Sequence, residues 1–181
     1  MSKETSLEYA LTHYYKNEMI SFMKAHPEYF EEALALAIID KQPYSWRAAW
    51  LLWSCISKND PRVQKHISKI IDCIGGRSDG HQRELLKILL EMNLNEEQEG
   101  YLFDICVSLW EQPGKKPSVR YTAFKFINKT AFEHPDLANE ILLLAQEKYM
   151  RTLSPGVHRS ILRMIRNTTA HHRTHIIYTN Q

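Results

Sequence analysis

Apolar residues recur at helical spacing along almost the whole of the 181-residue chain. The clearest apolar stripe lies in residues 61–74 and consists of Val63, Ile67, Ile70, Ile71 and Ile74. Residues three, four and seven positions apart share one face of an α-helix, so this stripe predicts an amphipathic helix. Residues 96–111 and 136–149 carry similar stripes. No run alternates apolar and polar residues with period two, which indicates an all-α protein.

Prolines and glycines mark where the helices are expected to begin and end. Pro27, Pro61 and Pro135 stand at helix starts, where the missing N–H of proline breaks no helical hydrogen bond. Gly75 and Gly76 follow the first stripe and are expected to end its helix. These signals predict four helix pairs, at residues 27–57, 61–93, 96–133 and 135–168.

The first 26 residues predict a cap on this array. A helix expected near residues 6–24 carries on one face Leu7, Leu11, Tyr15, Met19 and Phe22. A terminal repeat leaves one apolar face uncovered, and this helix is expected to cover it. We therefore expect a single domain over residues 1–181, formed by the cap in residues 1–26, the helix pairs in 27–168 and a tail in 169–181 whose weak periodicity indicates a frayed end.

An arginine returns at nearly constant spacing, with steps of 36, 37 and 39 residues. The recurring residues are Arg47, Arg83, Arg120 and Arg159, each at the start of a strongly apolar stretch. Self-similarity at a period of this length indicates a stacked array of helix pairs. We interpret the arginines as structural, with each guanidinium donating to carbonyls or a carboxylate in the turn between paired helices. The alternative is a row of arginines that faces a ligand.

The second helix of each pair resembles the matching helix of HEAT repeats, which typically reads Val-Arg-x-x-Ala-x-x-aliphatic. The segment Val119-Arg120-x-x-Ala123-x-x-Phe126 fits that pattern, and Trp46-Arg47-x-x-Trp50-x-x-Trp53 follows it with bulkier residues. The resemblance covers about residues 27–168 and implies a right-handed α-α superhelix. It implies little about activity, because such repeats serve many unrelated functions.

The charges are divided unequally between the two expected layers of helices. Acidic residues outnumber basic ones in the first helices of the pairs, residues 28–40, 61–74, 96–111 and 136–150. Basic residues dominate the second helices, residues 45–57, 81–92, 118–132 and 157–168. Glu84 and Glu91 are the only acids in that second layer.

This division of charge bears on a possible binding surface. A HEAT-like stack places its second helices along the concave side, so the resemblance implies a basic groove and an acidic back. A cleft of one sign of charge attracts partners of the other sign. The alternative is that the charges of the two layers pair with one another. The residues expected in the groove are Lys87, Arg120, Lys125, Arg163 and Arg166.

Three tryptophans, Trp46, Trp50 and Trp53, share one face of an expected helix. We expect them in the core, because this helix is apolar on nearly every face and buried aromatic side chains dominate core energetics. The alternative is a platform on which a base or a peptide stacks.

Composition excludes several classes of protein. No apolar run approaches the roughly 20 residues that a membrane helix needs, and the first residues do not form a secretory signal. The cysteines are Cys55, Cys73 and Cys106, which form no C-x-x-C pair and indicate buried thiols in a reducing cytoplasm. The net charge of +2 is too near neutral to indicate nucleic-acid binding by itself.

We expect no catalytic residue, metal or cofactor. His171, His172 and His175 could place two imidazoles on one helix face, but a structural zinc ion needs four ligands. Phosphate-binding-loop, zinc-protease and serine-hydrolase motifs are missing from the sequence. The HEAT-like alkylpurine DNA glycosylases place a carboxylate and aromatic residues in a basic groove. Here the second helices offer only Glu84 and Glu91, which weakens that comparison.

These observations favour a non-enzymatic cytoplasmic scaffold whose basic groove binds an acidic protein segment. The alternative is a HEAT-like nucleic-acid-binding protein, with or without a relation to the alkylpurine DNA glycosylases.

Overall fold

The computed structural model describes the backbone of residues 4–179 and the side chains of residues 4–172. Every regular element in this part of the chain is a helix. The chain forms two compact units, unit 1 (residues 1–98) and unit 2 (residues 99–181). Within the described residues, no helix combines the length and the apolar composition that crossing a bilayer requires.

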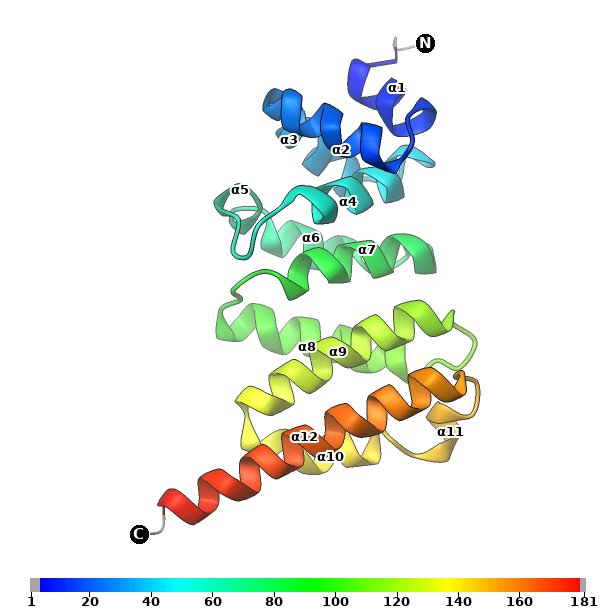
Figure 1. The fold of residues 1–181 in the computed structure, drawn as a ribbon. Helices are drawn as coiled ribbons and strands as arrows, with labels where there is room; N and C mark the ends of the chain where they lie inside the picture. The colour runs from blue at the N-terminus through cyan, green and yellow to red at the C-terminus, as the bar shows by residue number, and fades with distance from the viewer. Residues whose placement is uncertain (1–3, 180–181) are drawn as a thin grey trace. The chain divides into compact units, whose positions relative to one another are not determined.

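Unit 1 contains short and medium-length helices (Figure 1). They are α1 (Ser6–His13), α2 (Lys16–Ala25), a 3₁₀ turn (Pro27–Tyr29), α3 (Phe30–Ile38), α4 (Tyr44–Cys55), α5 (Pro61–Gln64), α6 (Ile67–Cys73) and α7 (Asp79–Leu90). The helix α4 lies at the centre of this unit and contacts α1, α2, α3 and α7. Its side chains Ala48, Ala49, Leu51 and Leu52 are completely buried. The small alanines allow the neighbouring helices to approach α4 closely.

Unit 2 contains the longest helices of the chain. Its elements are α8 (Glu96–Trp110), whose first turn contains the boundary between the units, α9 (Pro117–Glu133), a 3₁₀ turn (Pro135–Leu137), α10 (Ala138–Leu143), α11 (Glu147–Met150) and α12 (Pro155–Thr179). The helices α9 and α12 lie side by side (Figure 1). Two polar contacts hold them in register: the Tyr121 and Ser160 hydroxyls lie 2.8 Å apart, and the Thr168 hydroxyl donates to Asn128 Oδ1 at 3.1 Å.

The four expected second helices are observed as α4, α7, α9 and α12. The first helix of a pair is less regular. The pair that begins at Pro61 has α5 and α6 in place of one helix, and the pair that begins at Pro135 has α10 and α11. The proline at the start of α5 follows Asp60, whose side chain accepts the Arg62 N–H at 3.0 Å and caps the helix.

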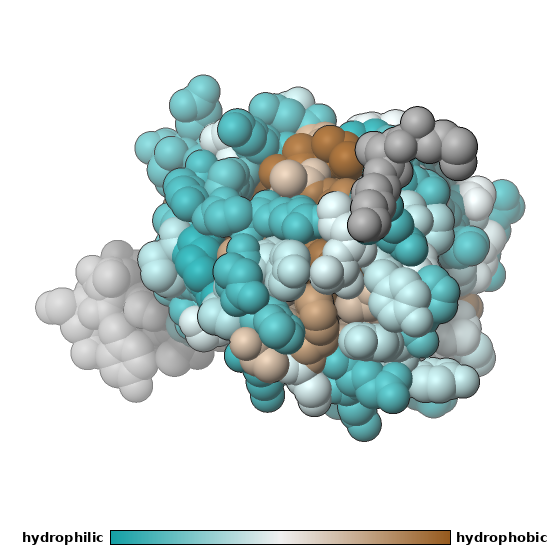
Figure 2. All heavy atoms as spheres, turned by 90° about the horizontal axis from the view of Figure 1, so that it is seen from above, coloured by the Kyte–Doolittle hydropathy of each residue, from teal (hydrophilic) through white to brown (hydrophobic). Residues whose placement is uncertain are grey.

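The N-terminal segment forms two helices where the sequence predicted one near residues 6–24. The chain is extended at Tyr14 and Tyr15, between α1 and α2. A new helix begins there because Glu18 reaches back and accepts the Tyr15 N–H at 2.7 Å. As a result Tyr15 leaves the expected apolar stripe and is 83% exposed. The face at this end of unit 1 is largely hydrophilic, with small apolar areas between the polar side chains (Figure 2).

The tail also differs from its expected form. The helix α12 continues to Thr179, whereas the sequence predicted a frayed end in residues 169–181. Contacts with α9 support this extension: His172 Nε2 lies 2.6 Å from the Ala131 carbonyl, and the His171 ring stacks on Phe132 with ring centroids 4.0 Å apart. Residues 180–181 lie outside the described chain.

Candidate interaction surfaces

The recurring arginines do not share one environment. Arg47 on α4 donates from Nη1 to the Leu11 carbonyl at 2.6 Å. Leu11 lies in the last turn of α1, where helix carbonyls have no helical partner. Arg47 therefore caps the end of α1, as basic side chains near helix C-termini often do.

Arg120 on α9 is completely buried. Its Nε donates to the Trp110 carbonyl at 2.9 Å, Nη1 to the Thr152 hydroxyl at 2.8 Å and Nη2 to the Tyr149 carbonyl at 2.5 Å. Burial lowers the pKa of Arg120 from its ordinary value. The sequence predicted this residue both as one of the recurring structural arginines and as a groove residue. Its position in the interior corrects the groove assignment, because no partner can reach a guanidinium that is fully enclosed.

Arg83 and Lys87 both form ion pairs with a carboxylate of their own helix, α7. Glu84 is fully buried and accepts from Arg83 Nη2 at 2.5 Å and from Lys87 Nζ at 2.7 Å. The Lys87 ammonium also lies 3.2 Å from the ring centroid of Trp53. Lys87 was expected to project freely into a groove, but these contacts hold it on the protein.

Three arginines of α12 form an exposed row. Arg159, Arg163 and Arg166 occupy positions i, i+4 and i+7 of the helix and all three are exposed. They line an open hollow of about 610 Å³ together with Gly156, Ser160 and Leu162. No residue in the described part of the chain forms an ion pair or a hydrogen bond with their guanidinium groups.

The basic character of this surface extends to α9. Lys125 is exposed, and its ammonium lies 4.9 Å from the ring centroid of Tyr121, the residue whose hydroxyl contacts Ser160 on α12. The sequence of α12 contains no Asp or Glu, and that of α9 contains only Glu133, at its end. We define the α9–α12 basic surface as Lys125, Arg159, Arg163 and Arg166.

The tryptophans of α4 lie differently from the prediction. Trp46, Trp50 and Trp53 are each only half-buried, so the prediction that they are core residues is wrong. The buried side of α4 is filled by its alanines and leucines instead. Ala48 and Ala49 were the signal in the sequence, because small residues mark the face that another helix approaches closely.

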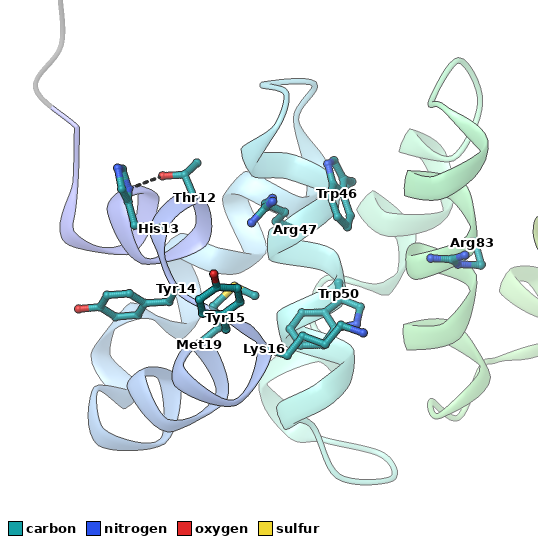
Figure 3. Close-up of a pocket in the computed structure, with 10 residues that line it drawn as sticks. All are labelled: Thr12, His13, Tyr14, Tyr15, Lys16, Met19, Trp46, Arg47, Trp50 and Arg83. Carbon is teal, nitrogen blue, oxygen red and sulfur yellow. Dashed lines mark hydrogen bonds between the residues drawn. The ribbon is translucent and has the colours of Figure 1, made fainter.

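Trp46 and Trp50 line a pocket of about 510 Å³ in unit 1 (Figure 3). Its other lining residues are Thr12, His13, Tyr14, Tyr15, Lys16, Met19, Arg47 and Arg83. The pocket thus brings four aromatic rings of Trp and Tyr together with three cationic side chains, and no acidic residue lines it.

The remaining candidates have structural environments. His172 contacts the Ala131 carbonyl and His171 stacks on Phe132, whereas the side chain of His175 lies outside the described residues. Among the side chains that the structure describes, no three His, Cys, Asp or Glu gather as metal ligands would. The three cysteines are free, and burial raises the pKa of each thiol.

These surfaces lie on an array whose family can be identified. A family model described as the HEAT repeat domain matches residues 4–172. The chain belongs to the HEAT repeat family. This assignment confirms the resemblance of the second helices and the all-α solenoid class, while the handedness of the superhelix stays a prediction. HEAT repeat proteins are typically scaffolds for protein interactions. No curated protein and no solved structure matches the chain significantly.

Proposed function

We propose that this HEAT repeat protein is a non-enzymatic scaffold that binds an acidic segment of a partner protein on the α9–α12 basic surface. The observation that carries the proposal is the row of Arg159, Arg163 and Arg166, exposed and without acidic partners among the described residues. An unpaired guanidinium offers a fork of donors that matches a carboxylate. Three such groups in a row suit successive carboxylates of one segment.

The geometry of the row supports a segment rather than a single carboxylate. Seven residues of α-helix separate Arg159 from Arg166, a rise of about 10 Å, which an extended peptide of about three residues spans. Leu162 is 49% exposed between the arginines and offers an apolar contact beside the charges. The three free cysteines fit a reducing compartment, so we propose the cytoplasm as the location.

Charge reversal tests the proposal. A variant with Arg159→Glu, Arg163→Glu and Arg166→Glu should fold, because exposed charges contribute little to stability, about 0–1 kcal/mol per ion pair. The variant should lose binding to a fluorescent Glu-rich peptide that the parent binds, while a Gln-rich peptide of equal length should bind neither. A control with Lys24→Glu, Lys58→Glu and Lys69→Glu changes the net charge equally at exposed sites of unit 1 and should retain binding.

A native pull-down with and without nuclease separates protein partners from nucleic acid. We expect a protein partner that survives nuclease, is lost with the arginine variant and is kept by the lysine control. If partners are recovered only when nucleic acid is intact, the surface binds nucleic acid instead of an acidic protein segment. The logarithm of the binding constant should then fall with the logarithm of the salt concentration, with a slope of about −0.7 to −0.9 per phosphate neutralised. If the arginine variant is folded and keeps every partner, the α9–α12 basic surface is not the binding site.

A further inference from the structure

The pocket between α4 and the turn that joins α1 to α2 has the composition of a ligand site. Its volume of about 510 Å³ falls within the roughly 300–1,000 Å³ of small-molecule pockets. Trp46 and Trp50 lie one helical turn apart on α4 and both line the pocket, whereas the alanines and leucines of that helix are completely buried. Partly exposed aromatic side chains that lie together in a concave surface are typical of binding sites.

The charges around these rings are cationic. The Lys16 ammonium lies 5.8 Å from the ring centroid of Trp50, and the Arg47 guanidinium lies 5.3 Å from that of Trp46. In Figure 3 the side chain of Lys16 runs beside Trp50, while Arg47 lies between Trp46 and Tyr15. Because no acidic side chain lines the pocket, it favours an anion.

Arg47 is well suited to hold that anion in place. Its hydrogen bond to the Leu11 carbonyl uses Nη1 and fixes the guanidinium. Its Nε is enclosed and cannot reach a ligand, so the donors that remain for an anion are those of Nη2 and the second hydrogen of Nη1. Arg83 adds a second guanidinium from α7, although two of its nitrogens already donate to Glu84.

The combination of rings and cations narrows the chemistry of the ligand. Indole faces stack well on any planar ring, as they do on nucleic-acid bases. A phosphate monoester carries a charge of about −1.5 to −2 at pH 7, which suits several cations better than the single charge of a carboxylate. We infer that the pocket binds a small aromatic phosphate, in which a planar ring stacks on Trp46 or Trp50 and the phosphate is held by Arg47 and Lys16.

Two common sources share this chemistry: a nucleoside monophosphate and a phosphotyrosine side chain. Indole N–H signals in a ¹H–¹⁵N spectrum of the full chain can distinguish them, because the chain contains four tryptophans. Titrations would use AMP, adenosine, ribose 5-phosphate, inorganic phosphate and N-acetyl-phosphotyrosine amide. We expect AMP or the phosphotyrosine amide to shift the signals of Trp46 and Trp50. The signal of Trp110 should stay, since that indole is fully buried in unit 2 and donates to the Leu144 carbonyl at 2.8 Å.

Matched variants test the roles of the ring and the cation. Trp50→Leu should raise the Kd at least about tenfold through the loss of stacking, whereas Trp53→Leu, on the same helix but outside the pocket, should leave it unchanged. Lys16→Met removes the ammonium group of an exposed side chain and should weaken the binding of phosphate ligands but not of adenosine. Lys24→Met, at another exposed site, is its control. This second pair keeps the test valid if a tryptophan variant fails to fold.

The inference is overturned by any of three results. These are no shift of Trp46 and Trp50 with either aromatic phosphate at millimolar concentration, equal affinity for inorganic phosphate, or equal affinity for adenosine. The site lies in unit 1, so the arginine triple variant of α12 should titrate like the parent. The pocket and the proposed peptide surface can therefore fail independently.

Discussion

At the scale of single residues, the half-buried and the fully buried tryptophans should differ in their contribution to stability. Trp110 is completely buried, and Trp110→Ala should reduce the free energy of unfolding by about 3–5 kcal/mol. Trp50 is half-buried, so Trp50→Ala should cost only about 1–2 kcal/mol. Urea unfolding of both variants measures the difference. Equal losses of unfolding free energy would mean that Trp50 contributes to stability as a core residue does.

The pocket-lining position of Trp50 could not be read from helical periodicity. A helix that is apolar on nearly every face shows no polar side, and the sequence does not say which of its faces another helix covers. The arginines show the same limit. Arg120 and Arg159 hold equivalent places in the repeat, yet Arg120 is enclosed by Tyr149 and Thr152 of the following helix pair, while Arg159 is exposed. Such neighbours come from tertiary packing.

The buried imidazole of His81 should make stability depend on pH. His81 Nε2 lies 2.8 Å from the Ala37 carbonyl, Gln42 contacts Nδ1, and Arg77 and Asp40 are the charged groups nearby. Burial lowers the pKa of His81, so the folded protein keeps it neutral while the unfolded chain takes up a proton near pH 6.5. The unfolded state then binds more protons, and stability decreases as the pH falls below about 6.5.

The variant His81→Gln isolates this effect. The free energy of unfolding of the parent should fall between pH 7.5 and 5.5 by more than that of the variant, as measured by urea midpoints at both pH values. Parallel pH profiles would show that His81 does not titrate in the unfolding reaction.

At the scale of elements, the helices end on side chains that the sequence only partly reveals. The break between α1 and α2 depends on Glu18 and contains neither proline nor glycine, so no helix-breaking residue marks it in the sequence. The start of α5 was visible, because Asp60 directly precedes a proline. The sequence therefore predicted a capped helix start where a proline followed the capping residue, and did not predict one that depends on Glu18 alone.

The cap of α5 supplies a prediction at this scale. Asp60 is buried and accepts from Arg62 Nε at 2.9 Å and Nη2 at 2.6 Å, and the Arg62 hydrogen bonds hold the pKa of Asp60 below its ordinary value. Asp60→Asn should cost about 1–3 kcal/mol at pH 7. A lowered carboxylate pKa gives stability that is present above the unfolded-state pKa of about 3.9 and is lost as the pH falls further.

Denaturation at pH 7 and pH 3 checks this cap. The difference between parent and Asp60→Asn should shrink at the lower pH, and the exposed Asp72→Asn should change little at either. A difference that stays constant with pH would mean that the carboxylate charge is not what stabilises the helix start.

Helix ends also depend on arginine, as two equivalent positions of the repeat can show. Arg120→Met should cost about 2–4 kcal/mol, because it leaves the buried Trp110 carbonyl and the partly buried Tyr149 carbonyl without this donor. Arg159→Met should change stability by less than about 0.5 kcal/mol, since it lies on the surface. Thermal and urea unfolding measure both. Similar effects would mean that burial does not separate the two arginines.

At the scale of the whole molecule, the array should not unfold as one block. Each repeat of a solenoid contacts mainly its neighbours, so its stability is a sum of local terms. Arg120→Met should therefore move the loss of the Trp110 indole signal, in unit 2, to lower urea concentration than the loss of the Trp46 signal, in unit 1. Identical shifts of both midpoints would show full cooperativity between the units.

The sequence predicted the repeat class because the period and the apolar faces are properties of the chain itself, and the family match agrees with it. The binding surfaces were predicted less well, because charge counts ignore pairing. Lys87 contributed to the expected basic layer, yet it lies against the buried Glu84. Arg163 and Arg166 belong to a helix without any carboxylate, and that local imbalance was the more informative signal.

The carbonyls at the ends of helices find their donors in an adjoining part of the array. Arg47 and Arg77, which follow in the chain, donate to Leu11 and Ile38, and Arg120, which precedes by one helix pair, donates to Tyr149. A helix pair excised at its loops would therefore lose some of the side-chain donors that cap the ends of its helices. For protein engineering, the exchangeable module of this solenoid does not coincide with the sequence repeat. A graft that is to keep these ends closed must carry the arginine of the adjoining pair with it, so its boundaries fall inside helices instead of between them.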